Sequence, residues 1–456
     1  MAILQEAAVE GIELEAWMKQ IPDLVGTFKT LYTRIKAATK TYPTAFITSA
    51  PGNVSSTYGL AQRPAFRVPV RIQSGSPILQ GTGDGDSLGR GTGSLWVSGS
   101  IQPVFVSAAC EISYLARRAT DGGKRAMTSV RAQELKNSLE SFMHGIEALF
   151  NQNGTGALDQ IPSSATVNNA TGGGSIGTPT YSSILGMNNA NQFVDQQVVQ
   201  VFNSTFGTNR GSFTISYVDG VANTLYSAQA LPSGTTTTDY LVVAGASPTS
   251  STSIVSIAGI QVYQVNGNSG TYLGLTKTNY PGRFSTPTVN LSGSAITPAI
   301  PFRAQIQIDR ALGPDTEEAE SLVWYMGPDQ QLQVNNMYQP VLIANVQEVK
   351  GDKQLDMVKK YMPETFGGRE IIVGYNQFPG RIDGLCLSTW GITELIEPSL
   401  YDFGNGVTSM PVVDTSSSTA GGYLTSNIFY YNAMLNLFNS NPRAGFFVTN
   451  AAIPTI

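Results

Sequence analysis

Apolar residues recur at helical spacing in two segments of the chain. Residues 2–39 carry apolar side chains every three to four positions, and Pro22 is expected to divide this segment into two helices. Residues 124–151 keep the same spacing over about seven turns, which predicts one long helix. The first helical segment is acidic in its first half and basic in its second half, which is typical either of solvated faces or of an arm that docks on charged partners.

Residues 64–106 show the alternation of two long strands. Phe66, Val68 and Val70 alternate with Arg67 and Arg71, and strand-forming residues resume from Leu95. The glycine-rich segment 81–94 separates the two strands. It lacks the lysine of a phosphate-binding loop and the distal acid of a calcium loop, so it is interpreted as a hairpin tip. Because a two-stranded ribbon is not stable alone in water, we expect it to pack on another structure, such as another subunit.

The rest of the chain reads as a mixture of helices and strands, so the predicted fold class is α+β. A helix is expected at Ser182–Phe202, and helical spacing returns over residues 303–326. Strands are expected at Val341–Glu348, Arg369–Tyr375, Arg381–Thr389, Ser426–Phe438 and Ala444–Thr449. Residues 205–300 contain only five charged residues and alternate short apolar stretches with turn residues. This β-rich segment is either a separate inserted domain or an elaborated sheet.

The composition of the chain excludes several classes of function. Charged residues make up 13% of the chain, against about a quarter in an ordinary soluble domain. The net charge of −5 argues against tight sequence-independent binding of nucleic acid. The two cysteines, Cys110 and Cys386, and the single histidine, His144, cannot build a thiolate or histidine-rich metal centre, although one disulfide is left open. We expect no catalytic residues, no cofactor and no metal.

The N-terminus has no secretory signal pattern, and no apolar run is long enough to span a membrane. We therefore expect no membrane association.

The order of these elements resembles the major capsid protein of tailed bacteriophages, the HK97-like fold. Three stretches add to the resemblance: NQNGTGALDQI at 151–161, YPGRFSTPTVN at 280–290 with a helix ending at 311–313, and NPRAGFFVTN at 441–450. The resemblance implies the following division of the chain: an N-terminal helical arm at 1–42, an E-loop region at 43–108, a peripheral (P) domain with its spine helix at 109–180, the start of an axial (A) domain at 181–204, a β-rich insertion at 205–300, and the A domain at 301–456 with return strands of the P domain, expected at 366–389.

The resemblance also implies a structural protein without enzymatic activity. Such a chain self-assembles as homo-hexamers and homo-pentamers into an icosahedral shell that encloses double-stranded DNA and contacts it non-specifically. Portal, scaffolding and decoration proteins are the expected partners, and the expected location is the virion, after assembly in the bacterial host cytoplasm. A β-rich tail-fibre or adhesin protein is the alternative, because the centre of the chain is rich in Ser, Thr and Gly.

Two sets of contact residues follow from this resemblance. The expected inter-subunit contacts of the E-loop are Phe66, Arg67, Val68, Arg71, Arg90, Leu95 and Trp96. The expected contacts of the assembly arm are Leu4, Ile12, Met18, Lys29, Arg34 and Lys36.

Some members of the family link an E-loop lysine covalently to an asparagine of a neighbouring subunit. Here no lysine occurs between Lys40 and Lys124, and arginine stays protonated, so no such link is expected. The low charge of the chain then fits a protein whose hairpin and sides are covered by neighbouring subunits.

Overall fold

A computed structural model of the chain describes residues 30–38, 66–75, 93–114, 130–169, 181–313, 320–346, 365–404, 406–413 and 423–453. These residues belong to two compact units. The ribbon unit comprises Val104–Ala148 and Glu394–Leu435, and the sheet unit comprises Thr30–Pro103, Leu149–Thr393 and Asn436–Ile456. No helix in the described ranges is long and apolar enough to cross a membrane.

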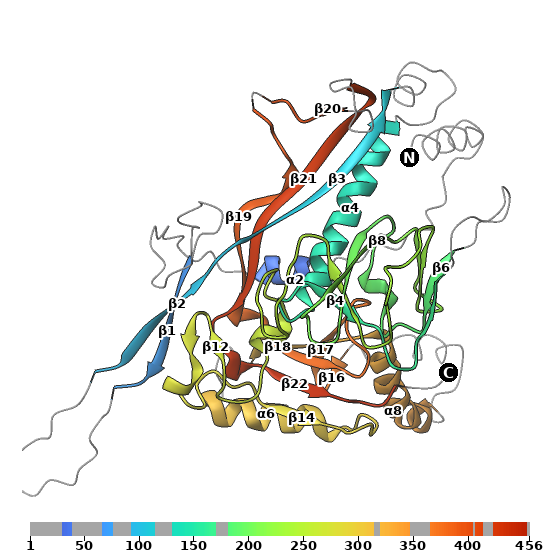
Figure 1. Ribbon diagram of the computed structural model, residues 1–456. Helices are drawn as coiled ribbons and strands as arrows, with labels where there is room; N and C mark the ends of the chain where they lie inside the picture. The colour runs from blue at the N-terminus through green and yellow to red at the C-terminus, as the bar shows by residue number, and fades with distance from the viewer. Residues whose placement is uncertain are drawn as a thin grey trace, which may run out of the picture. The chain divides into compact units, whose positions relative to one another are not determined.

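The ribbon unit combines a long helix with long antiparallel strands (Figure 1). Its elements are α4 (Val130–Phe150), β3 (Val104–Ser113), β19 (Trp390–Leu400), β20 (Met410–Val413) and β21 (Tyr423–Asn439), where α4, β19 and β21 continue into the sheet unit. Strand β21 pairs with β3 along one edge and with β19 and β20 along the other. The Tyr431 ring stacks on Phe142 of α4 with 6.3 Å between centroids, and its hydroxyl donates to the Leu135 carbonyl over 2.6 Å.

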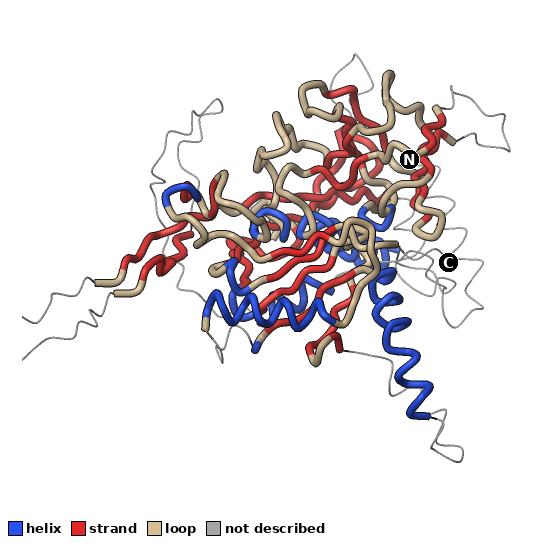
Figure 2. The backbone as a smooth tube through the Cα atoms, turned by 90° about the horizontal axis from the view of Figure 1, so that it is seen from below, coloured by secondary structure: helices blue, strands red, loops and turns tan. Residues whose placement is uncertain are grey.

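The sheet unit is built on a six-stranded mixed sheet in the order β14-β22-β18-β15-β17-β16. These strands are β14 (Thr288–Asn290), β15 (Leu322–Met326), β16 (Thr365–Phe366), β17 (Arg369–Val373), β18 (Ile382–Cys386) and β22 (Phe446–Thr449). Helix α6 (Ala299–Leu312) covers one face of this sheet and lies in front of its strands in Figure 2, and helix α8 (Pro328–Val346) adds Val334 to the same core. The pairing of β14 with β22 and of β15 with β17 is parallel, and the remaining pairings are antiparallel.

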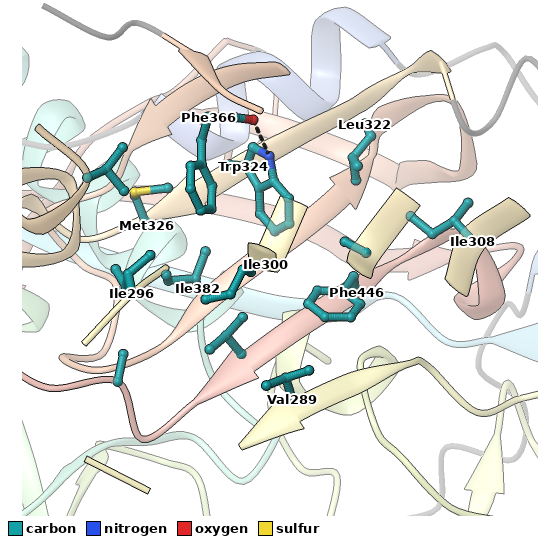
Figure 3. Packing of buried hydrophobic residues seen from close by; sticks show 14 of the residues in the cluster. Val289, Ile296, Ile300, Ile308, Leu322, Trp324, Met326, Phe366, Ile382 and Phe446 are labelled. Carbon is teal, nitrogen blue, oxygen red and sulfur yellow. Dashed lines mark hydrogen bonds between the residues drawn. The ribbon is translucent and has the colours of Figure 1, made fainter. Parts of the chain in front are cut away.

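The core of the sheet unit is centred on Trp324. Its ring contacts the rings of Phe366 and Phe446 edge-on, and its Nε1 donates to the Phe366 carbonyl over 2.9 Å (Figure 3). Ile300 and Ile308 of α6 pack into the same cluster. The buried indole nitrogen is therefore satisfied inside an apolar core, as a buried tryptophan requires.

Two further four-stranded sheets complete the sheet unit. One has the order β4-β11-β7-β8 and the other the order β5-β6-β10-β9. Their strands are β4 (Ala157–Gln160), β5 (Thr166–Asn168), β6 (Ser182–Leu185), β7 (Val198–Phe202), β8 (Asn209–Thr214), β9 (Tyr217–Asp219), β10 (Thr224–Ser227) and β11 (Tyr240–Val243). The smaller elements are α2 (Thr30–Ala38), β1 (Phe66–Gln73), β2 (Leu95–Ile101), α5 (Ile260–Tyr263), β12 (Thr271–Tyr272), β13 (Leu275–Thr276) and the single-turn 3₁₀ helices η2 (Ala190–Gln192), η3 (Lys277–Asn279), η4 (Leu387–Thr389) and η5 (Pro442–Ala444).

The boundary predicted at residue 205 does not separate two parts of the fold. It falls between β7 and β8, which pair antiparallel, and β14 of the same segment joins the six-stranded sheet. Of the two alternatives for residues 205–300, the elaborated sheet is therefore the one that the structure contains.

Several predicted elements are corrected by the structure. Residues 182–202 form β6, η2 and β7 where a helix was expected, because Asn189 caps a single 3₁₀ turn and the segments on either side pair with other strands. Residues 341–346 lie in α8 where a strand was expected, since a short apolar run is ambiguous between the two structures. Within 303–326, the last five residues form the buried strand β15.

Residues 366–389 were expected to return to the domain of the long helix. Instead β17 and β18 lie in the six-stranded sheet, next to β15. The strands that share the ribbon unit with α4 come from Val104–Ser113 and from Glu394–Leu435.

Candidate assembly surfaces

The β1–β2 hairpin carries most of the residues that were predicted from the sequence to contact another subunit. The strands pair antiparallel, with Arg71 opposite Trp96 and Arg67 opposite Ser100. Because side chains alternate along a strand, these residues share one face, and that face is exposed. The Trp96 side chain is 59% exposed and the neighbouring Leu95 is 45% exposed. The hairpin thus presents an aromatic and cationic face.

The opposite face of the hairpin belongs to the core of the chain. Phe66 and Val68 are buried, although the sequence nominated both as contacts with another subunit. The alternation of strand β1 explains the correction, since only every second residue can face outward. Arg90 lies outside the described residues.

A second, shorter hairpin holds the base of β2. Leu273 and Gly274 form the two-residue turn between β12 and β13, and both have positive φ, 50° and 75°, as a type I′ turn requires. The Leu273 carbonyl accepts a hydrogen bond from the Ser100 amide over 2.9 Å. A Cβ at Gly99 would lie 2.7 Å from the Leu273 Cβ, so only glycine allows this close approach. Sequence reasoning missed this anchor, although a glycine between two short strand-forming stretches was a signal for the turn.

The described part of the arm, α2, is tied to its own chain. Leu31 and Ile35 are fully buried, and α2 contacts β17 and η4. The Arg34 guanidinium pairs with the Glu370 carboxylate over 2.6 Å, and the Lys36 ammonium lies 3.3 Å from the Tyr32 hydroxyl and over its ring. Arg34 and Lys36 thus make contacts within the chain, and their role in contacts with a partner stays a prediction. Leu4, Ile12, Met18 and Lys29 lie outside the described residues.

A buried polar network joins the β-rich sheets to the central sheet within the sheet unit. The Asn189 side-chain amide donates to the carbonyls of Tyr375 and Gln377, over 2.7 and 2.9 Å. The Gln377 side-chain amide donates in turn to the Asp383 carboxylate. The same carboxylate forms an ion pair with the Arg381 guanidinium over 2.9 Å. At the other end, the Asn189 backbone amide donates to the Asp159 carboxylate over 3.2 Å.

Asp159 is the titratable end of this network. Burial raises the pKa of its carboxyl to about 6, and hydrogen bonds from Asn188, Asn189 and Gln160 offset only part of that effect. The folded chain therefore binds the proton of this group more tightly than the unfolded chain does. The tighter binding of this proton stabilises the folded chain. The stabilisation is complete below about pH 4 and is lost as the pH rises through about 6.

We expect Asp159→Asn to remove this pH dependence, because asparagine resembles the neutral form of the carboxyl. Between pH 4 and pH 7 the free energy of unfolding of the natural chain should fall by about 2 kcal/mol more than that of the variant. Urea unfolding at a series of pH values measures the difference. Parallel pH profiles for the two chains would contradict the assignment.

The described residues contain no group of three metal-ligating side chains. Cys110 and Cys386 are both buried and are not joined by a disulfide, which closes the question that the sequence left open. His144 is buried on α4.

Comparison with known proteins identifies the fold. No protein-family model and no curated protein matches the sequence. Among solved structures, a chain of the cyanophage A-1(L) capsid asymmetric unit is similar at a TM-score of 0.50 and 10% identity, and the match covers 95% of this chain and 96% of that one. Chains from Gordonia phage Cozz (9% identity, 94% and 91% covered) and Mycobacterium phage Adephagia (8%, 97% and 98%) match at a TM-score of 0.43.

The first match covers both compact units. The chain therefore has the α+β, HK97-like fold of phage capsid proteins, and the fold class expected from the sequence is confirmed.

Proposed function

We propose that this chain is the major capsid protein of a tailed bacteriophage and has a structural role without enzymatic activity. The observation that carries the proposal is the similarity to a phage capsid chain over nearly the full length of both proteins. Subunits would associate as hexamers and pentamers into an icosahedral shell around double-stranded DNA. The tail-fibre alternative is not favoured, since the chain shares its fold with a phage capsid chain over nearly its full length.

The β1–β2 hairpin is the surface that we assign to contact with a neighbouring subunit. Its exposed face carries Trp96 and Arg71, the residue types that dominate the energy of protein interfaces. Its other face is anchored by Leu273, so the exposed face is held in a defined orientation. In a closed shell the same contact repeats around every ring, and many modest contacts then sum to a stable assembly.

Portal, scaffolding and decoration proteins remain the further partners that we propose, with the virion as the final location and the bacterial cytoplasm as the site of assembly. With a net charge of −5, the shell would enclose DNA without binding it tightly. The parts of the domain division that the fold does not correct also stay proposals, and we propose that residues 205–300 lie on the outer surface of the A domain.

Negative-stain electron microscopy of the expressed full-length chain tests the proposed function. Shells, hexamers or pentamers are the expected particles. Fibres, or monomers at every concentration and salt condition tried, would contradict it.

We expect mature particles to contain no covalent link between subunits through the hairpin. The segment between Lys40 and Lys124 has no lysine to supply the amine of an isopeptide bond. After boiling in denaturant, particles should run as a single band at 48.6 kDa or at the mass of a trimmed chain. A ladder of multiples of that mass would show that another residue forms the link.

A further inference from the structure

Three tyrosines form a compact cluster on the sheet β5-β6-β10-β9, separate from the proposed assembly surfaces. Tyr217 of β9 stacks on Tyr226 of β10, with 4.4 Å between ring centroids and 19° between ring planes. Tyr181 lies 5.2 Å from Tyr217 and 6.3 Å from Tyr226, nearly perpendicular to both. These three distances close a small triangle. Tyr181 therefore lies beside the stacked pair and does not cover the outer face of Tyr217.

The outer face of Tyr217 is open to solvent. In the described part of this sheet β9 is an edge strand, and the Tyr217 side chain is 40% exposed. Ile184 and Leu225 are buried on the opposite face of the sheet, so the tyrosines lie on its solvent side. One flat aromatic surface, held by stacking on a second ring, is thus available to a ligand.

Polar side chains reach the edge of β9 on both sides of Tyr217. The Asp195 carboxylate accepts a hydrogen bond from the Val218 amide over 2.8 Å, and the Gln196 side-chain amide donates to the Ser216 carbonyl over 3.0 Å. Residues 216 and 218 flank Tyr217 directly. A carboxylate and a primary amide are therefore bonded to the backbone on either side of Tyr217.

We propose that this tyrosine platform binds neutral carbohydrate, with one pyranose ring stacked on Tyr217. The C–H face of a pyranose is apolar and matches an aromatic ring, while its hydroxyl groups match the carboxylate of Asp195 and the amide of Gln196. The proposal goes beyond the shell function, because that function requires no ligand at this sheet.

Two other classes of ligand fit the site less well. Nucleic-acid bases also stack on tyrosine, but the carboxylates of Asp195 and Asp219 lie beside the strand that carries Tyr217 and repel phosphate. A protein partner needs an interface of about 800 Å² on each side, far larger than one open ring. A small, neutral, polyhydroxylated ligand is the class that the geometry favours.

Equilibrium binding of fluorescently labelled maltohexaose, cellohexaose and chitohexaose to the full-length chain, free and assembled, tests the proposal. The natural chain should bind at least one of the three hexasaccharides. Tyr217→Ala should weaken that binding about tenfold through the lost stacking, and Tyr217→Trp should restore it. Gln196→Asn should weaken binding several-fold, since asparagine tolerates the positive φ of 63° at this position but its shorter side chain cannot reach the ligand.

Val221→Ala is the matched control. Val221 is 98% exposed in the turn between β9 and β10, and its truncation should leave binding unchanged. If Tyr217→Ala fails to fold, the comparison of Tyr217→Trp with Gln196→Asn still decides the question. The proposal is overturned if none of the three sugars binds the natural chain, if the Tyr217 and Gln196 variants bind as well as the natural chain, or if Tyr217→Ala alters only the oligomeric state.

Discussion

A chain that carries both Arg71→Glu and Trp96→Ala is expected to fold but to stop at monomers or small oligomers. The two side chains lie opposite each other on the exposed face of the β1–β2 hairpin. Truncation of a buried interface tryptophan costs about 2 kcal/mol or more, and reversal of an arginine that meets an acidic partner adds repulsion. Because every subunit of a ring repeats the contact, a modest loss for each contact should prevent closure of the shell.

Size-exclusion chromatography with light scattering measures this outcome, and circular dichroism checks that the variant is folded. Val221→Ala and Arg283→Glu are the controls, since they make the same kinds of change at exposed positions outside the hairpin. Normal shells from the double variant would show that the hairpin face is not a contact surface. Equal loss of shells from the controls would show that any change of surface charge or apolar area disturbs assembly.

Gly99→Val is expected to release the β1–β2 hairpin from its anchor. A Cβ at this position would lie 2.7 Å from the Leu273 Cβ and 3.3 Å from the Leu273 carbonyl, which accepts the hydrogen bond from Ser100. Overpacking of this kind costs about 1–3 kcal/mol. Valine has a higher intrinsic preference for strands than glycine, so propensity alone would predict that Gly99→Val stabilises the hairpin. The sign of the effect therefore separates the tertiary contact from local preference.

Hydrogen exchange at the amides of β1 and β2 reports the release directly, and the yield of shells reports its consequence. Gly93→Val is the matched control, because Gly93 lies just before β2 and a Cβ there would meet nothing within 4 Å. Faster exchange only in Gly99→Val is the expected result. Unchanged protection in that variant, or equal loss in both, would count against the anchor.

Long periodic segments were predictable because their signal is local. The apolar repeat of residues 124–151 predicted α4, the alternation from Phe66 predicted β1, and strand-forming aromatic residues within Ser426–Phe438 predicted β21. Short apolar runs were not predictable in the same way. Leu322–Met326 became a buried strand and residues 341–346 became helix, since a run of five or six apolar residues suits either structure.

For a related reason, the exposed face of the β1–β2 hairpin was predictable only in part. Alternation along β1 separates Phe66 and Val68 from Arg67 and Arg71, but a period of two does not say which face is covered. That choice is made by contacts with distant residues. Leu273, more than 170 positions from Gly99 along the chain, supports the base of β2, and Glu370 holds Arg34 of the arm.

The sequence by itself determined the class of the fold, the long helix and hairpin, and the absence of a lysine that could link subunits, because these depend on order, period and composition. Only the tertiary structure decided which residues are exposed. It tied α2 to its own chain, divided the hairpin into a buried and an open face, and brought Tyr181, Tyr217 and Tyr226 together. Such contacts join residues far apart in the chain, and their formation depends on how whole sheets pack, which no local pattern of side chains records.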